Sequence, residues 1–396
     1  MKQLTWCLAL TLTITTNPLA ADELASIKAD LVTLLARVEA LEAENRQLKS
    51  TEVKPEPANN LKLKGDIRYR YESIDVQGKA PRDRNRVRSR VALTTKLPND
   101  VEIGIGLASG SSDPTSSNQT LGGGGSSKSI NLDLAYFSWN SHPNVSITAG
   151  KYKNNFYSPE KNGLLWDGDY NPEGVAITYD NGQLFSHFAL HWLDSDSING
   201  SPRAAVGLQA GYAMDLEQAQ LTFGAGFYDV SVQGQSVFRG NPDDFFGNSF
   251  TCVDTATLLG CTYTHDYEQV ELFAHLKTKI GDSLFVAFVD YVNNRVADDL
   301  NAGWSTGFTL GKAIAPGTWQ IAYIYEDIEA DAVFKALADS DFGGGVTDSK
   351  GHVLKGTLAI NNNWKVGINY FDNVSNVDRG ADKDYNRIQF ETVLKF

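Results

Sequence analysis

Apolar and polar residues alternate with a period of two along most of the chain from Leu61 onward. In residues 61–72, Leu63, Ile67 and Tyr69 fall on one face of an extended segment, and lysines and arginines fall on the other. This period is typical of β-strands whose two faces meet different surroundings. The pattern predicts about sixteen strands, near residues 61–72, 85–97, 101–108, 130–139, 145–152, 174–181, 184–193, 204–214, 219–229, 266–279, 284–294, 302–312, 318–328, 352–361, 364–373 and 385–396.

Short turns and long loops alternate between these expected strands. Transmembrane β-barrels have short turns at one end and long loops at the other. Strands of about 10 residues cross the lipid when they are tilted, and a closed barrel pairs every backbone polar group without free edges. The turns fall near residues 98–100, 141–144, 180–182, 215–218, 281–283, 315–317 and 361–363, and the connections at the other end include the long loops 110–129, 151–174, 231–264 and 329–350.

Aromatic residues near the expected strand ends also favour a barrel in a bilayer. Trp139, Trp192, Trp319 and Trp364 lie at such positions, where outer-membrane barrels carry aromatic girdles. A soluble β-solenoid would have a fixed repeat, and a sandwich would need a second packed layer. The sequence has no fixed repeat. We therefore predict an all-β transmembrane barrel of about sixteen antiparallel strands in residues 61–396.

The first residues predict a secretory signal, here residues 1–21. Lys2 gives a positive start, an apolar stretch follows at residues 4–14, and small residues allow cleavage after Ala20 or Ala21. The mature chain would then lie outside the cytoplasm. No run of 18 apolar residues predicts a helix across a bilayer. The formal net charge of −13 argues against a nucleic-acid partner, because binding phosphates requires a basic surface.

Three cysteines occur in the chain, and Cys7 would be removed with the signal. Cys252 and Cys261 remain close together in one expected loop. In an oxidising compartment such a pair favours a disulfide, and two free thiols are the alternative. A zinc site is disfavoured, because no second Cys or His pair accompanies them at zinc spacing.

Residues 22–50 follow a different period and predict a helix. Apolar residues recur at alternating spacings of three and four, without Gly or Pro, which is a coiled-coil heptad. A lone amphipathic helix of this length is marginal in water, so the stripe implies a partner helix. Residues 51–60 contain two prolines and predict an extended linker. The coiled-coil residues are Leu24, Ile27, Leu31, Leu34, Arg37, Val38, Leu41, Glu42, Asn45 and Leu48.

Two signals in this helix disagree about the number of strands in the coiled coil. Arg37 and Glu42 flank Val38 and Leu41 in a pattern that resembles a motif of trimeric coiled coils. Asn45 at a seam position is more usual in dimers. We favour a trimer over a dimer, and over a single helix packed on its own domain.

The last expected strand ends the chain on Phe396. Its alternation up to that residue resembles the C-terminal recognition strand that bacterial outer-membrane proteins present to their barrel assembly machinery. With residues 164–167 and 171–174 and the coiled-coil start, the mature chain is similar to the putative porin family of Gram-negative bacteria. The resemblance implies a homotrimer of sixteen-stranded barrels in the outer membrane, contacting lipid and lipopolysaccharide, with a periplasmic coiled coil. It also implies passive diffusion of small hydrophilic solutes and ions through a water-filled channel, constricted by an inward-folded third long loop.

The candidate site combines that loop, residues 151–174, with arginines of the first two strands. The loop is rich in turn formers yet carries large apolar residues, which need a surface to pack on. The arginines take the parity that faces away from lipid, where each would cost ~2–4 kcal/mol. An acidic loop facing a basic wall would create a transverse field that orients polar solutes. We predict Phe156, Leu164, Leu165 and Trp166 as buried loop anchors, Glu160, Asp167, Asp169 and Glu173 as the acidic side, and Arg68, Arg70, Arg86, Arg88 and Arg90 as the basic wall.

Other interpretations of these residues remain open. The arginines could simply pair with strand carboxylates such as Asp66, Glu72 and Glu102. The chain could also be a structural tether that links the outer membrane to the cell wall through the coiled coil, with transport secondary. A barrel enzyme is disfavoured, because no nucleophile stands beside an oriented base.

We predict no metal or cofactor site. Asp167, Asp169 and Asn171 match the start of a calcium loop, but Pro172 stands where that loop requires glycine. His187 and His191 alternate with apolar residues and are expected to face the lumen.

Overall fold

A computed structural model describes residues 28–29, 31–44, 61–196, 203–241 and 244–396. The chain divides into two units, Met1–Asn59 and Asn60–Phe396. In the first unit, residues 28–29 and 31–44 are helical, and the apolar stripe at Leu31, Leu34, Val38 and Leu41 is exposed. No helix among the described residues has the length and apolarity needed to cross a membrane. The expected signal at 1–21, the linker at 51–60, and Leu24, Ile27, Asn45 and Leu48 lie outside the described residues.

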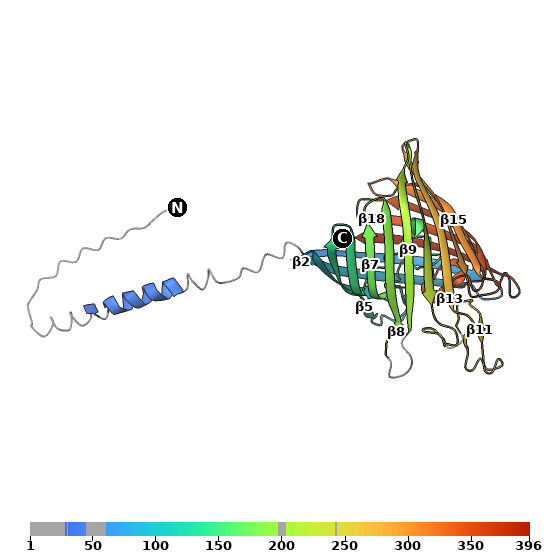
Figure 1. The fold of residues 1–396 in the computed structure, drawn as a ribbon, viewed down its shortest axis with the longest axis horizontal. Helices are drawn as coiled ribbons and strands as arrows, with labels where there is room; N and C mark the ends of the chain where they lie inside the picture. The colour runs from blue at the N-terminus through green and yellow to red at the C-terminus, as the bar shows by residue number, and fades with distance from the viewer. Residues whose placement is uncertain (1–27, 30, 45–60, 197–202, 242–243) are drawn as a thin grey trace, which may run out of the picture. The chain divides into compact units, whose positions relative to one another are not determined.

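The second unit is a closed antiparallel barrel (Figure 1). Its described part contains sixteen long strands that pair in chain order, and the first pairs with the last. The prediction of about sixteen antiparallel strands is therefore confirmed. They are β1 Lys62–Val76, β2 Arg82–Leu97, β3 Val101–Ser109, β5 Ile130–His142, β6 Val145–Lys151, β7 Glu173–Asp180, β8 Leu184–Asp194, β9 Arg203–Asp215, β10 Ala219–Val230, β13 Tyr267–Ile280, β14 Ser283–Asn294, β15 Ala302–Gly311, β16 Trp319–Ile328, β17 Ser349–Ala359, β18 Trp364–Ser375 and β19 Lys383–Lys395.

In the described parts of the long loops there are three very short strands. β4 Gln119–Thr120 pairs with β2, and β11 Phe250–Thr251 pairs with β12 Thr262–Tyr263 in a separate hairpin. A disulfide joins Cys252 to Cys261 within that hairpin.

The barrel closes where its first strand, β1, pairs with its last strand, β19. The backbone N–H of Gly65 on β1 donates to the carbonyl of Phe396 (3.0 Å), and the N–H of Phe396 donates to the carbonyl of Gly65 (3.1 Å). The Phe396 ring covers Gly65, where an added Cβ would lie 2.4 Å from a ring carbon and 2.6 Å from the carbonyl oxygen of Arg90. Only glycine fits this contact, so the seam depends on a small residue opposite the terminal aromatic ring.

Alternation along the strands separates two environments. On β1, Leu63, Ile67 and Tyr69 are exposed on the outer face, whereas Arg68 and Arg70 are buried on the inner face. Apolar groups on the outside and charged groups on the inside are the arrangement of a barrel in lipid, the reverse of a soluble protein.

Two long loops fill much of the interior. The third loop, residues 152–172, connects β6 to β7 and contains the short 3-10 turn η1 Pro159–Lys161. The seventh loop, residues 329–348, connects β16 to β17 and contains the 3-10 turns η2 Lys335–Leu337 and η3 Phe342–Gly344. Both loops contribute buried residues to one cluster with inward residues of the strands, such as Tyr228 and Val292. The core therefore lies inside the barrel and includes the loops.

Candidate functional site

Aromatic stacking fixes the third loop to the inner wall. Phe156 stacks on Trp166 with ring centroids 5.7 Å apart, and Trp166 stacks on Tyr170 at the same separation. Tyr228 of β10 presents an edge to Phe156 at 4.8 Å. Leu164 is fully buried at 0% exposure. Packed aromatic faces and edges stabilise such clusters beyond the area they bury, so these side chains determine where the loop lies.

Polar contacts carry the loop across the interior. The side-chain amide of Asn162 donates to Asp290 of β14 (2.7 Å), and the backbone N–H of Tyr157 donates to Gln209 of β9 (2.7 Å). On another part of the barrel, Asp169 accepts from Arg90 of β2 (2.9 Å). Around the closed sheet β2 lies far from both β9 and β14, so a loop that contacts all three spans the interior.

The seventh loop pairs with the third through the backbone. The N–H of Asp167 donates to the carbonyl of Leu337 (2.9 Å), and the N–H of Asp339 donates to the carbonyl of Gly163 (3.1 Å). The N–H of Ser340 donates to the carboxylate of Asp167 (3.0 Å). Three hydrogen bonds between two irregular segments satisfy backbone groups that would otherwise be buried without partners. The two loops therefore form one packed body.

The fifth loop, residues 231–266, supports the seventh from its other side. The side-chain amide of Asn248 donates to the carbonyls of Ala330 (2.8 Å) and Val333 (2.9 Å). Phe334 packs its ring against Tyr263 and Tyr267, with centroids 5.4 and 5.5 Å away. The inward position of the seventh loop thus rests on both neighbouring loops.

Like charges face each other across β1 and β2. Arg68 lies opposite Arg88, and Arg70 lies opposite Arg86. Directly opposed like charges destabilise a strand pair, so this wall requires carboxylates between the arginines. The structure supplies them from β1, from β19 and from both inward loops.

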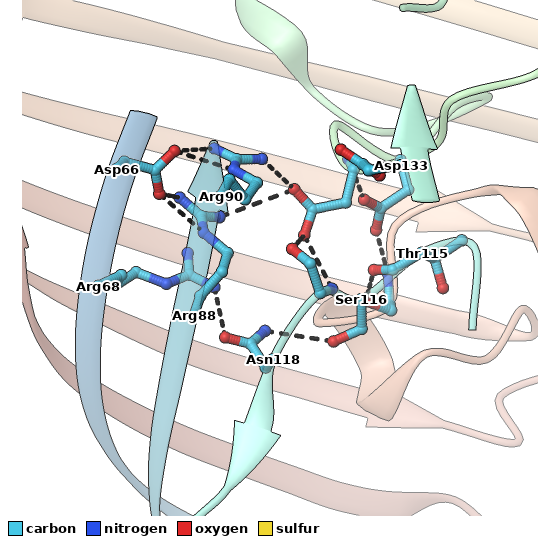
Figure 2. A network of polar contacts seen from close by, with 12 residues as sticks. Asp66, Arg68, Arg88, Arg90, Thr115, Ser116, Asn118 and Asp133 are labelled. Carbon is cyan, nitrogen blue, oxygen red and sulfur yellow. Dashed lines mark hydrogen bonds and ion pairs between the residues drawn. The ribbon is translucent and has the colours of Figure 1, made fainter. Parts of the chain in front are cut away.

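Asp66 and Asp169 neutralise one end of the basic wall. Asp66 accepts from Arg88 (2.8 Å) and from Arg90 (2.8 Å), as Figure 2 shows. Asp169 pairs with Arg90 at 2.9 Å and with Arg88 at 3.7 Å, and it also accepts from the Ser117 hydroxyl (2.9 Å). The third loop is thereby tied to the wall by a carboxylate that two arginines share.

Three carboxylates neutralise the other end. Glu391 of β19 pairs with Arg70 at 2.9 Å. Asp341 of the seventh loop pairs with Arg70 at 3.3 Å and with Arg387 at 2.9 Å. Buried Glu72 contacts Arg387 and also Arg84 and Arg86. The network thus contains seven arginines and five carboxylates, namely Arg68, Arg70, Arg84, Arg86, Arg88, Arg90, Arg387, Asp66, Glu72, Asp169, Asp341 and Glu391.

Ionisation of the loop carboxylates follows these surroundings. Burial opposes the charge of Asp341, but Arg387 and Arg70 outweigh it and hold the pKa of that carboxyl well below its ordinary range. Burial also opposes the charge of Asp169, and Arg88 and Arg90 lower its pKa. Asp167 has no arginine partner among the described residues, and burial and the nearby Asp339 raise its pKa to about 8. Asp341 and Asp169 therefore have lowered pKa values that favour the charged form, whereas Asp167 has a raised pKa that favours the neutral form.

Among the described residues, two cavities with mainly polar linings lie between the loops and the wall. The narrower has a volume of about 160 Å³, and Arg68, Arg70 and Arg88 line it together with Asp167 and Asp169. The second, about 320 Å³, lies toward the short-turn ends of β15 to β19, where Thr309, Gln320, Thr357, Asn369 and Gln389 line it. At ~30 Å³ per water molecule, the larger cavity has room for about ten waters.

Comparisons with known proteins identify the family. The sequence model of the family described as "Putative porin" matches residues 76–239 and 259–396, most of the barrel unit. The chain belongs to this family. The resemblance to the putative porin family that the sequence indicated is therefore confirmed. No curated protein sequence matches the chain.

Solved porins share the fold of this porin. OprB of Pseudomonas putida, in its high-pH structure, superposes with a TM-score of 0.59 at 12% identity, covering 85% of this chain and 94% of that one. A double mutant of the Rhodopseudomonas blastica porin gives a TM-score of 0.50 at 12% identity, covering 85% and 100%. At such low identity the likeness establishes the barrel fold alone. Family and fold together indicate an outer-membrane channel.

The sequence-predicted anchors of this porin are all buried. Phe156, Leu164, Leu165 and Trp166 have exposures of 8%, 0%, 4% and 9%. The arginines of the basic wall all point inward and are all in ion pairs.

The four carboxylates expected on the acidic side of the porin separate. Only Asp169 contacts the basic wall. Glu160 lines the larger cavity and pairs with His275 (3.3 Å), whereas Asp167 lines the smaller cavity and faces the seventh loop. Within the described residues, Glu160 and Asp167 share a cavity with arginines of the wall but form no ion pair with them, because other groups satisfy these carboxylates.

Glu173 does not belong to the interior of the porin. It is the first residue of β7 and shares the outward parity of Val175 and Ile177. Its side chain is 61% exposed and pairs with Lys151 (3.1 Å). The prediction that Glu173 lies on the acidic side of the channel is therefore corrected. The strand β7 begins at Glu173, one residue earlier than expected, and this places the side chain on the outward face.

The alternative pairing of the arginines also holds in part. Asp66 and Glu72 pair with them, whereas Glu102 accepts from the Tyr136 hydroxyl (3.0 Å). His191 is buried beside Tyr170, and His187 contacts Thr178. Strand carboxylates and the third loop thus share the basic wall.

Sequence reasoning missed several residues of the porin interior. Arg387 and Glu391 lie on β19 at the inward parity, and the period of two would have revealed them. Asp339 and Asp341 lie in the seventh loop, which the sequence predicts only as a long loop with no stated inward path. Its apolar run at 330–338 was the available signal, of the same kind that indicated the third loop.

Proposed function

We propose that this porin forms a water-filled channel for passive diffusion of small hydrophilic solutes and ions, with its constriction between the third loop, the seventh loop and the basic wall. The contacts of Asp169 with Arg90 and of Asn162 with Asp290 carry the proposal. They hold one loop against strands that lie far apart around the barrel. Rings of fixed charge at a narrow point select solutes by size and polarity.

A domain division accompanies this proposal. Residues 1–21 would be the signal peptide, 22–50 a periplasmic coiled coil, 51–60 a linker and 61–396 the outer-membrane barrel. The exposed stripe at Leu31, Leu34, Val38 and Leu41 supports a partner helix, and a homotrimer would bury it. Lipid and lipopolysaccharide would surround the barrel, and the strand ending at Phe396 would engage the assembly machinery.

Liposome swelling tests the channel. Full-length porin in liposomes should admit sugars and amino acids at rates that fall steeply with size, because the cavities are small. Deleting residues 22–60 should leave the permeability per barrel intact and abolish the trimer on size-exclusion chromatography.

A structural tether is the second candidate, and the exposed apolar stripe of the helix is the observation that favours it. A tether with a filled lumen would give no swelling with any solute. That result would refute the channel and leave the tether.

A further inference from the structure

The two interior cavities meet at a set of shared charged residues. Arg70, Lys355, Asp339 and Asp341 line both. The two cavities are therefore neighbours, with these four side chains between them. A solute that moves directly from one cavity to the other contacts this meeting point.

Most charges at this point are already matched. Asp341 is shared by Arg70 and Arg387, and Asp169 is shared by Arg88 and Arg90. Asp339 accepts the backbone N–H of Asp341 (2.9 Å). Groups with several strong partners are costly to recruit for a ligand, because each existing contact must be replaced.

Two cations are less well matched, Lys355 and Arg68. Lys355 on β17 is half-buried and makes no hydrogen bond or ion pair with any other residue in the described ranges. Arg68 is 9% exposed, and its buried Nε has no hydrogen-bond partner there. Its remaining contacts are a bond from Nη2 to Asn118 (2.7 Å), which Figure 2 shows, and a looser approach of Nη1 to Glu391 (3.6 Å). Arg68 lines the smaller cavity, and the loose contact of its Nη1 leaves donor capacity that an oxyanion there would use.

The wider balance of charge also favours an anion. Four cations, Arg68, Arg70, Arg88 and Lys355, and four carboxylates, Asp167, Asp169, Asp339 and Asp341, line the smaller cavity, so their formal charges balance. Lys161 of the third loop adds a further cation to that cavity and, in the described chain, makes no side-chain ion pair. The potential inside a small cavity with fixed charges of one excess sign attracts the opposite sign.

The larger cavity suits the hydroxylated part of an organic anion whose charged group lies at the meeting point. Gln320 and Thr357 line it and make no side-chain hydrogen bond within the described residues, so their donors and acceptors are available. The carboxylates of Glu160 and Asp339 line it as well and can accept from hydroxyl groups. Phe288 and Phe371 supply apolar surface. A cavity with this lining accommodates polar, uncharged groups and offers no unmatched cation other than Lys355.

We propose that the meeting point of the two cavities is a binding subsite for small hydroxylated organic anions, with the oxyanion group between Lys355 and Arg68 and the hydroxylated chain in the larger cavity. The proposal rests on the proposed channel and names its solute class. A carboxylate and a phosphate share the required chemistry.

Gluconate and sorbitol test the subsite, because they differ chiefly in a carboxylate in place of a hydroxymethyl group. Gluconate should block single-channel chloride current in planar bilayers in a saturable way, and sorbitol should not. Glucose 6-phosphate is tested in parallel. Whichever of glucose 6-phosphate and gluconate blocks at the lower concentration identifies phosphate or carboxylate as the preferred group.

The variant Lys355→Gln keeps a polar side chain and removes the charge. It should weaken the gluconate block about tenfold, or about 1.4 kcal/mol, and leave sorbitol swelling unchanged. Lys365→Gln is the matched control, since Lys365 shares the inward parity of Asn369 on β18 but lines neither cavity. It should change the block by less than twofold.

The subsite is wrong if the wild-type channel conducts and admits sorbitol but shows no saturable gluconate block, or if both lysine variants weaken the block equally. Failure of the channel itself would look different, because wild-type porin would then give neither current nor sorbitol swelling.

Discussion

Asp169→Asn should shift the selectivity of the channel toward anions. Asp169 lines the smaller cavity, of about 160 Å³, and a sphere of that volume has a radius of about 3.4 Å. An ion at its centre then lies roughly 5 Å from the carboxylate, where one unit charge in water is worth about 0.8 kcal/mol. Screening with a Debye length of ~8 Å at 0.15 M salt roughly halves that energy. The change then amounts to about twofold for each ion, and to about fourfold in the chloride-to-potassium permeability ratio.

The effect should grow as salt is diluted. At 0.01 M the Debye length is about 30 Å and screening across the cavity nearly vanishes, so the expected change in the ratio is about tenfold. Reversal potentials in a potassium chloride gradient measure it. Arg88 and Arg90 keep Asp66 as a partner in the variant, so the barrel should remain folded and heat-modifiable on electrophoresis.

Glu217→Gln is the matched control, because Glu217 is exposed in a short turn and its loss alters net charge by the same amount. Its permeability ratio should not change. An Asp169→Asn channel with the wild-type ratio at both salt concentrations would refute the assignment of this carboxylate to the conducting path.

Three further predictions concern the loops. Leu164→Ala leaves a void at a fully buried position and should cost about 2–5 kcal/mol of loop packing, seen as larger and noisier conductance, whereas Leu208→Ala on the outer face should leave conductance unchanged. Burial raises the pKa of Asp167 to about 8 from the ordinary 3.8, so contact between the two loops should be strongest below pH ~4 and weaken as the pH rises toward ~8. Conductance of the wild-type channel should therefore increase over that pH range. A similar increase in the Asp167→Asn variant would show that Asp167 is not its origin. Replacing Cys252 and Cys261 by Ser should remove about 2.5–3 kcal/mol of chain-entropy stabilisation and speed proteolysis of the hairpin, with no change in conductance; altered conductance would place the hairpin in the conducting path.

The fold was accessible from sequence because a bilayer imposes a strict period. Outward positions must be apolar and inward ones are free to carry charge, so β1 and β2 could be recognised residue by residue, including the inward arginines. Register between strands was also constrained, since a one-residue slip would turn Arg68 and Arg70 toward lipid. These are local patterns, and local patterns can be recognised in a single sequence.

The site could be predicted from the sequence only in part, because the residues that pair with one another there come from distant segments of the chain. Asp169 was expected near the arginines, but nothing in the chain between them indicates that Asp341 and Arg387 join the same network. The contact of Glu160 could not be predicted for a similar reason, since its partner His275 lies on β13. Pairings across the lumen depend on the path of two irregular loops, and irregular loops have no period from which to derive them.

The seventh loop explains why the third can be both polar and inward. A loop inside a barrel must find partners for its backbone groups, and an inner wall whose strands are already paired supplies few. The seventh loop provides them at Asp167 and Gly163. Gly163 has a φ of +83°, and a Cβ there would lie 2.8 Å from the Cβ of Asp339, so this contact requires glycine for both conformation and space. The inward path of the third loop therefore depends on the seventh loop as much as on its own apolar anchors.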